Sequence, residues 1–220
     1  MKGRRQTIHV GCISISPIYD MIADAICRTT EDGWDKHFLV EHASFKKLRL
    51  ELEDGKRDCI LSLSDELREL SSEYVQTPLA VLHPALIISR QHPLYRENMT
   101  VKDVENATIY VLSTKFAYNA ELNVLRCCKY YGFVPRDIRY FDDVASLEMA
   151  LYAGQGIALI YPEFLRNPTG MLARFPIDIK MAEANELTLA YHRDKAEAMA
   201  PFIEALKRRA AEKTVTAEWL

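Results

Sequence analysis

The stretch from Asp143 to Pro162 constrains the fold more than any other part of the chain. Asp143 precedes the apolar run Val144–Ala153, and aspartate is among the residues preferred at the N-cap of a helix. The turn Gly154-Gln155-Gly156 follows, and Ile157–Tyr161 is then a short, wholly apolar segment that stops at a proline. The stretch therefore predicts a capped helix, a tight turn and a buried strand, which is the order found where helices cover a sheet.

Strands and helices are predicted to alternate through both halves of the chain. We expect strands at Thr7–Ile13, His37–His42, Cys59–Leu61, Ala85–Ser89, Thr108–Leu112, Ile138–Phe141, Ile157–Tyr161 and Leu187–His192. We expect helices after Ser16 and after Ser44, each with that serine as N-cap, and at Asn119–Tyr131, Val144–Ala153 and Ala196–Ala211. The β-α-β-α-β order up to Leu61 favours a parallel sheet wrapped by helices, and the pattern then starts again, which indicates an α/β protein with two lobes.

Composition narrows the classes of function. Apolar residues make up 49% of the chain, enough for two cores, and the net charge is −3. The isoelectric point of about 6.1 argues against direct DNA contact, because nucleic-acid-binding domains usually lie above ~9. The longest apolar runs fall far short of the ~20 residues that cross a bilayer, and no apolar segment follows the basic start Met1–Gln6. We therefore expect a cytoplasmic domain with no membrane partner.

No catalytic residue, metal site or cofactor is expected. The five cysteines form no Cys-x-x-Cys pair, and the six histidines form no His-x-x-x-His pair. Gly154-Gln155-Gly156 precedes a strand instead of following one, which reverses the order of a dinucleotide-binding turn. The chain also lacks a Gly-x-Ser-x-Gly elbow and a phosphate-binding loop. An enzyme is therefore not the expected class.

A second pattern lies upstream, where the apolar segment Val81–Ser89 leads to His92-Pro93-Leu94. Its order and separation from the Asp142–Pro162 stretch resemble the effector-binding domain of LysR-type transcriptional regulators, over nearly the whole chain. The resemblance implies a periplasmic-binding-protein-like fold of type II, with two Rossmann-like lobes joined by a hinge of two crossovers. It implies that residues 1–83 with 185–220 form lobe I and that residues 84–184 form lobe II.

The resemblance also implies a function. A small polar or anionic effector would bind in a cleft between the lobes and control transcription. Contact with DNA would be made only through a helix-turn-helix module that we do not find in this chain, and the domain would pair as a homodimer. Two alternatives stay open: a solute-binding receptor of a transporter, against which the missing signal peptide counts, and a stand-alone cytosolic small-molecule-binding protein.

Hydroxyl-rich strand ends are the candidate ligand site, because ligands of open α/β sheets bind beyond the carboxyl ends of the strands. The candidate residues are Ser14, Ser16, Ser44, Ser62, Ser113, Thr114, Lys115 and Phe116. By family resemblance, all of these except Ser62 and Lys115 match or adjoin effector-contacting positions. Helix capping alone also explains Ser16 and Ser44, and a lysine such as Lys115 is more often solvated than bound to an anion.

The adjacent cysteines Cys127 and Cys128 raise the possibility of a redox switch. Peroxide-sensing members of the family resemble this chain across the second lobe, and Cys128 falls close to their resolving cysteine. Asn119 stands where those members need a reactive cysteine. We therefore expect Cys128 to be a core residue.

Overall fold

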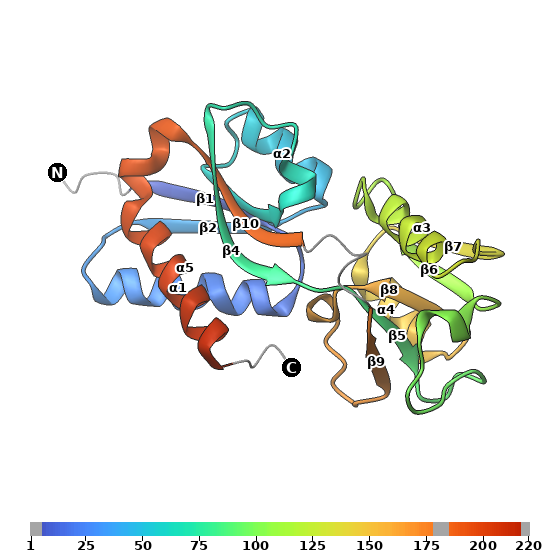
Figure 1. Cartoon of the computed structure of the whole chain (residues 1–220). Helices are drawn as coiled ribbons and strands as arrows, with labels where there is room; N and C mark the ends of the chain where they lie inside the picture. The colour runs from blue at the N-terminus through green and yellow to red at the C-terminus, as the bar shows by residue number, and fades with distance from the viewer. Residues whose placement is uncertain (1–5, 178–184, 217–220) are drawn as a thin grey trace. The chain divides into compact units, whose positions relative to one another are not determined.

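The computed structural model describes residues 6–177 and 185–216 and divides the chain into two compact units. The first unit comprises Met1–Val81 and Glu186–Leu220, and the second comprises Leu82–Asn185. Within the described ranges, each unit contains one five-stranded sheet with helices on both faces (Figure 1). The expected α/β fold with two lobes is thereby confirmed.

The sheet of the first unit has the strand order β2-β1-β3-β10-β4. Its strands are β1 (Thr7–Cys12), β2 (His37–His42), β3 (Cys59–Leu63), β4 (Tyr74–Leu82) and β10 (Asn185–His192). Strands β2 and β3 both pair in parallel with β1, whereas β10 pairs with β3 in antiparallel. The parallel pairing expected of the first three strands is therefore confirmed. The direction of β10 was not predicted. This strand follows the second unit in the chain, so no helical crossover of the kind that joins parallel neighbours fixes its direction.

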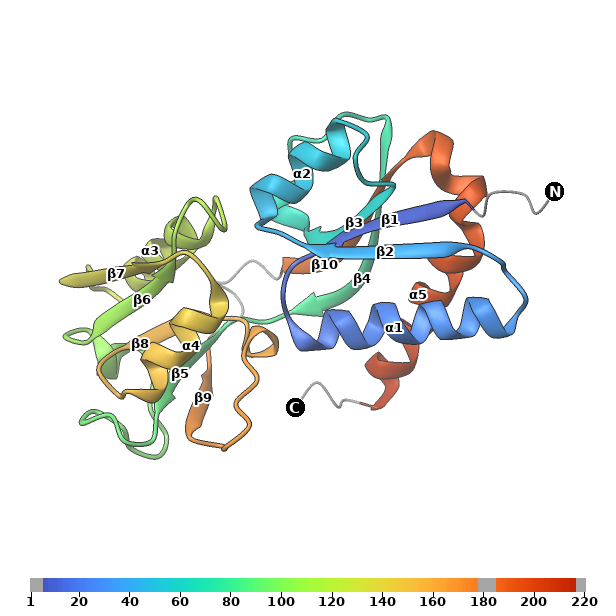
Figure 2. The ribbon, with the colours of Figure 1, turned by 180° about the vertical axis from the view of Figure 1, so that it is seen from behind.

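Helices α1 (Ser16–Glu31) and α5 (Ala196–Thr216) lie together on one face of this sheet, and α2 (Phe45–Glu53) lies on the other (Figures 1 and 2). Each helix buries the apolar stripe that its periodicity predicted. The buried side chains are Ile18, Met21, Ile22 and Ala25 in α1, Phe45, Leu48 and Leu52 in α2, and Met199, Phe202, Ile203 and Leu206 in α5. Hydrophobic spacing thus fixed which side of each helix faces the sheet.

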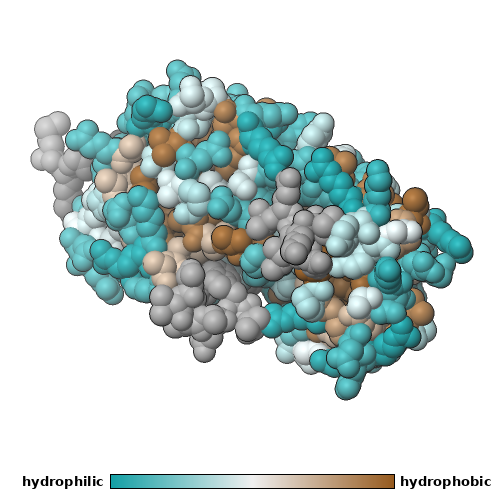
Figure 3. All heavy atoms as spheres, in the orientation of Figure 1, coloured by the Kyte–Doolittle hydropathy of each residue, from teal (hydrophilic) through white to brown (hydrophobic). Residues whose placement is uncertain are grey.

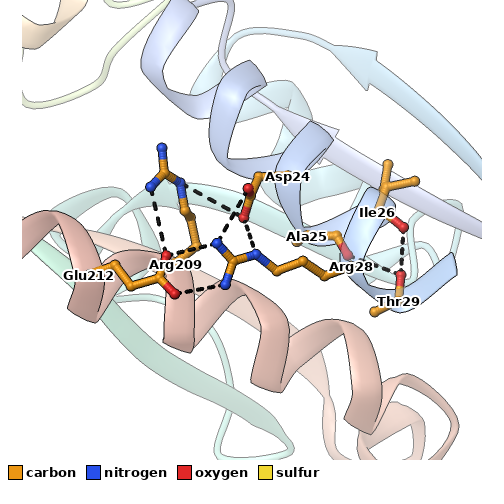
Figure 4. Close-up of polar contacts among 7 residues, drawn as sticks. All are labelled: Asp24, Ala25, Ile26, Arg28, Thr29, Arg209 and Glu212. Carbon is orange, nitrogen blue, oxygen red and sulfur yellow. Dashed lines mark hydrogen bonds and ion pairs between the residues drawn. The ribbon is translucent and has the colours of Figure 1, made fainter. Parts of the chain in front are cut away.

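A cluster of charged side chains joins α1 to α5 (Figure 4). The Arg28 guanidinium donates to both carboxylate oxygens of Glu212, at 2.7 and 2.8 Å, and its Nε lies 2.7 Å from Asp24 Oδ2. Arg209 adds longer ion pairs of 3.8 Å to Asp24 and to Glu212. Single surface ion pairs contribute little to stability, but a four-residue network fixes the side-by-side packing of the two helices beyond their apolar contact.

The sheet of the second unit has the order β7-β6-β8-β5-β9. Its strands are β5 (Ala85–Ser89), β6 (Thr108–Leu112), β7 (Asp137–Phe141), β8 (Ile157–Ile160) and β9 (Leu172–Pro176). Strands β7 and β8 pair in parallel with β6, while β5 is antiparallel to both β8 and β9. Helices α3 (Ala120–Tyr130) and α4 (Val144–Tyr152) cover opposite faces (Figures 1 and 2). Both sheets are thus mixed, and each contains three neighbouring strands that pair in parallel.

Short 3₁₀ helices complete the described parts: η1 (Ser64–Leu67), η2 (Val101–Val104), η3 (Pro162–Phe164) and η4 (Arg193–Lys195). A capping box precedes η2, where the backbone N–H of Thr100 donates to Asp103 Oδ2 at 2.8 Å. The Asn167–Gly170 turn is closed by the Gly170 N–H, which donates to the Asn167 carbonyl at 3.1 Å.

Three local features differ from the sequence-based expectation. Strand β4 was not predicted, because Pro78 interrupts its pattern, and proline is tolerated there because β4 is an edge strand. Strand β9 was also not predicted; it lies at the edge of the other sheet and ends in Pro176. Ser16 is not an N-cap: α1 begins at Ser16 itself, and the extended residue Ile15 occupies the cap position.

The two linked sequence patterns lie against each other in the second unit. Gly154 has a φ of +66°, and a Cβ there would lie 3.5 Å from the backbone nitrogen of His92. A Cβ on Gly156 would lie 2.5 Å from the Tyr110 ring. His92 Nδ1 accepts a hydrogen bond of 3.1 Å from the Leu94 N–H, which closes the turn of the first pattern. Both patterns therefore consist of residues that pack tightly within the second unit.

Hydrophilic residues cover most of the face drawn in Figure 3, and apolar residues reach it in separate small groups. Within the described residues, no helix combines the length and the apolar content that crossing a membrane requires.

Candidate functional site

The parallel strands of the first unit bring three candidate serines to one edge of the sheet. Cys12 pairs with His42 on one side and with Leu61 on the other, so β1, β2 and β3 end at the same edge. Ser14 and Ser44 each lie two residues beyond the end of a strand, while Ser62 is the last residue but one of β3. Ser16, the first residue of α1, follows Ser14. The edge is thus lined by hydroxyl-bearing positions from three strands.

These serines differ in what their hydroxyls already do. Ser14 is exposed. Ser44 is half-buried and caps α2, but its Oγ accepts from the Lys47 N–H at 3.4 Å, a long distance for a hydrogen bond. The capping hydrogen bond of Ser44 is therefore weak.

Ser62 is the unusual member of this group. Its side chain is 0% exposed, and its Oγ makes no hydrogen bond with any residue that the structure describes. Strand pleating puts Ser62 on the same sheet face as Ile60, whose side chain lies 3.0 Å from the Cβ position of Gly11 under α2. A buried hydroxyl without a partner costs about 1–3 kcal/mol. Ser62 therefore places a buried hydroxyl, unsatisfied by any described residue, near the end of β3.

A buried arginine holds the elements around this edge in place. Arg57 is 8% exposed, and its Nη1 lies 2.5 Å from Glu41 Oε2 and its Nη2 2.9 Å from Glu51 Oε2. These contacts tie the end of β2 to α2 and to the turn before β3. The Arg57 guanidinium is therefore already paired with two carboxylates of the first unit.

The second unit builds a corresponding edge from β6 and β7. Leu112 pairs with Phe141, and the Ser113 N–H donates to the Phe141 carbonyl at 2.8 Å, so the two strands end together. The Ser113 hydroxyl then donates to Asp142 Oδ1 at 2.6 Å, and Lys115 Nζ lies 3.3 Å from Asp142 Oδ2. The Ser113 hydroxyl, and after it the Lys115 ammonium, hold the pKa of the Asp142 carboxyl below its usual value. Asp142 is therefore a carboxylate at neutral pH.

Asp142 was not among the predicted site residues, because only its neighbour Asp143 had an evident role. Asp143 does cap α4, with Oδ1 accepting from the Ser146 N–H at 2.7 Å. A signal for Asp142 was nevertheless present in the sequence: it follows β7 as directly as Ser113 follows β6. Carboxylates that follow parallel strands belong to the same edge as the hydroxyls.

The other candidates of the second unit lie in the loop before α3. Thr114 is exposed, and the Lys115 side chain is 80% exposed. Phe116 is only 8% exposed, whereas Tyr118 is 67% exposed. Tyr118 therefore offers much more aromatic surface to a ligand than Phe116 does. Within the described ranges, no three His, Cys, Asp or Glu side chains are arranged to hold a metal ion.

Solved structures with a similar fold include domains of transcriptional regulators. The BenM effector binding domain with its effector benzoate superposes with a TM-score of 0.74 at 16% identity, covering 95% of this chain and 94% of that chain. A Corynebacterium glutamicum OxyR C206 mutant gives a TM-score of 0.71 at 17% identity, covering 98% of this chain and 68% of that one. The C-terminal domain of a probable LysR family transcriptional regulator from Rhodococcus sp. RHA1 gives 0.69 at 19% identity, covering 92% and 99%. No curated protein matches the chain.

The two α/β lobes and the likeness to these structures define a domain with the periplasmic-binding-protein-like fold of type II. The family model of the LysR substrate binding domain matches residues 2–211, and the chain belongs to this family. The resemblance found in the sequence is thereby confirmed, and with it the function of a ligand-sensing regulatory domain. The family is one of regulators and not of enzymes, and the alternative of a transporter receptor is not favoured.

Proposed function

We propose that this domain binds a small polar or anionic organic effector at its strand ends and passes the binding signal to a helix-turn-helix module that contacts DNA. The proposed contact residues are Ser14, Ser16, Ser44, Ser62, Ser113, Thr114, Lys115 and Phe116. The BenM domain, which has the same fold, has the small anion benzoate as its effector, which supports this class of ligand.

The observation that carries the proposal is the Ser62 hydroxyl. It lies at the strand-end edge, it is buried, and no described residue satisfies it. A polar atom of an effector would gain a hydrogen bond there without breaking one in the protein. Hydrogen bonds of this kind contribute about 0.5–1.5 kcal/mol each.

A thermal-shift screen of small organic acids, amides and amines tests the proposal. A true effector at ~100 times its dissociation constant adds ~2.7 kcal/mol of stability. We then expect Ser62→Ala to weaken the best stabiliser about tenfold, the equivalent of ~1.4 kcal/mol. The unliganded Ser62→Ala protein should be as stable as the parent, because the substitution removes an unsatisfied hydroxyl.

Ser89→Ala is the matched control. Ser89 is also a fully buried strand serine, but it ends the antiparallel strand β5, and its Oγ accepts from the Gln91 N–H at 3.2 Å. We expect this variant to lose stability and to keep its affinity for the stabiliser. Stabilisers whose affinity is unchanged by alanine at Ser14, Ser62 and Ser113 would contradict the assignment of the site.

We further infer that the domain forms a homodimer, since two-fold dimers are the commonest assemblies of this size, and that it works in the cytoplasm, where a regulator meets DNA. Light scattering checks the dimer against the 25.2 kDa mass of one chain. A strict monomer at high concentration would remove this part of the proposal.

A further inference from the structure

Asp142 stands out because it changes the chemistry of the second unit's strand ends. Its carboxylate accepts a hydrogen bond from the Ser113 hydroxyl, with Oγ 2.6 Å from Oδ1, and one from the Lys115 ammonium, with Nζ 3.3 Å from Oδ2. The Asp142 side chain is 62% exposed and that of Lys115 80%, so an approaching molecule can reach both. We propose that Asp142 is a specificity-determining residue, which selects an effector that presents a nitrogen hydrogen-bond donor over one that presents a carboxylate at this place. The inference rests on the proposed function and narrows the class of effector.

Counting donors and acceptors supports this choice. A hydroxyl donates one hydrogen bond, and that of Ser113 goes to Asp142, so Ser113 Oγ can only accept a hydrogen bond from a ligand. A carboxylate has room for about four hydrogen bonds and can likewise only accept. Two of the three groups in this cluster therefore offer acceptor sites, which an ammonium or an amide N–H₂ can use directly.

The charge of the cluster points in the same direction. The carboxylate of a ligand at Ser113 would meet the like charge of Asp142, and it could gain Lys115 only by drawing the ammonium away from Asp142. A nitrogen donor bonds to Asp142 and Ser113 while both existing contacts stay intact. The arrangement thus favours the donor through attraction and disfavours the carboxylate through repulsion.

The opposite end of the same two strands has a similar arrangement, which supplies a control. Thr108 donates to Asp137 Oδ2 at 2.7 Å, and Arg139 lies 3.8 Å from the same oxygen. Thr108 pairs with Asp137 in the register of β6 and β7, so this cluster lies at the amino end of β7 and the Asp142 cluster beyond its carboxyl end. Only the carboxyl ends are the usual place of ligands in such sheets.

The test is a titration of the whole chain with benzoate, benzamide and benzylammonium, which share one ring and differ in the polar group. The aromatic ring suits the 67% exposed side chain of Tyr118 in the same loop. Binding is followed through the backbone amide NMR signals of Ser113, Thr114 and Asp142 at constant ionic strength. We expect at least one of the two nitrogen compounds to bind at least tenfold more tightly than benzoate, and the comparison between benzamide and benzylammonium shows whether a charge is needed.

Two variants make the test specific. Asp142→Asn removes the charge but keeps an oxygen that accepts from Ser113, so the fold is preserved, and the preference for nitrogen compounds should fall about tenfold. Asp137→Asn should leave the preference unchanged. Equal or tighter binding of benzoate, a preference that survives Asp142→Asn, or no binding of any of the three compounds would overturn the inference. The proposed function is judged separately, by the metabolite screen and by Ser62→Ala.

Discussion

The two units both place hydroxyl groups where parallel strands end, but they leave those hydroxyls in different states. In the first unit, Ser62 is buried without a partner among the described residues, and Ser44 is held only by a long capping bond. In the second unit, Ser113 is bonded at 2.6 Å to a carboxylate. The first edge can therefore both donate and accept, whereas the second mainly accepts. The two edges therefore differ in the hydrogen bonds that they can offer.

Replacing a buried glycine by alanine should give the largest difference in stability between the two units. A Cβ on Gly156 would lie 2.5 Å from the Tyr110 ring and 2.9 Å from the Thr108 carbonyl oxygen, which is backbone and cannot move cheaply. A Cβ on Gly11 would meet the end of the flexible Leu48 side chain at 2.7 Å. We expect Gly156→Ala to cost about 3 kcal/mol and Gly11→Ala about 1 kcal/mol of unfolding free energy. Urea denaturation measures both, and equal costs or the reverse order would show that the second unit packs less tightly than described.

Helix capping should give a smaller contrast. Asp143 accepts from the Ser146 N–H at 2.7 Å and from its hydroxyl at 2.8 Å, while Ser44 accepts from the Lys47 N–H at 3.4 Å. Asp143→Ala should therefore cost about 1–2 kcal/mol, near the upper end for an N-cap, and Ser44→Ala less than about 0.5 kcal/mol. The comparison is made by chemical denaturation at one pH. A large loss for Ser44→Ala would mean that Ser44 is primarily structural, and its place in the ligand site would then lose support.

The buried cysteines of the two units should differ very little in their reactivity toward peroxide. Burial raises the pKa of Cys12 to about 12 in the first unit, and of Cys127 to about 11 and Cys128 to about 12 in the second. Thiols with such pKa values stay protonated at neutral pH and react slowly. Dilute peroxide should therefore modify the exposed Cys27 first and leave the unfolding midpoint unchanged. Thiol mapping by mass spectrometry checks this, and rapid, reversible oxidation of Cys128 would identify a sensor instead of a core residue.

Most helices and strands were predictable, because each is defined by its own residues. The stripe of α1, the cap of α4 and the apolar strand β8 all follow from local periodicity and capping. The direction of β10 and the edge strands β4 and β9 were not predictable in this way. Their positions depend on pairing with strands far away in the chain, and the prolines in β4 and β9 obscure the local pattern.

The positions of the candidate site residues could be predicted from the sequence, but their burial and hydrogen bonds could not. Strand ends identified Ser62 and Ser113 from the sequence, because both follow apolar segments. The burial of Ser62 without a partner and the bond from Ser113 to Asp142 depend on neighbouring strands and helices, which only the fold brings together. The sequence therefore predicted positions for a ligand site, and the structure shows which hydroxyls at these positions already have hydrogen-bond partners.

Hydrogen–deuterium exchange of the whole chain, with and without the strongest stabiliser from the screen, tests the central claim most directly. We predict that protection concentrates in the segments that follow the parallel strands, at residues 13–16, 42–45, 62–64, 113–118 and 142–146. Exchange near Asp58 and near Asp137, at the amino ends of β3 and β7, should stay unchanged. Protection centred on those amino ends, with none at Ser62 and Ser113, would contradict the account.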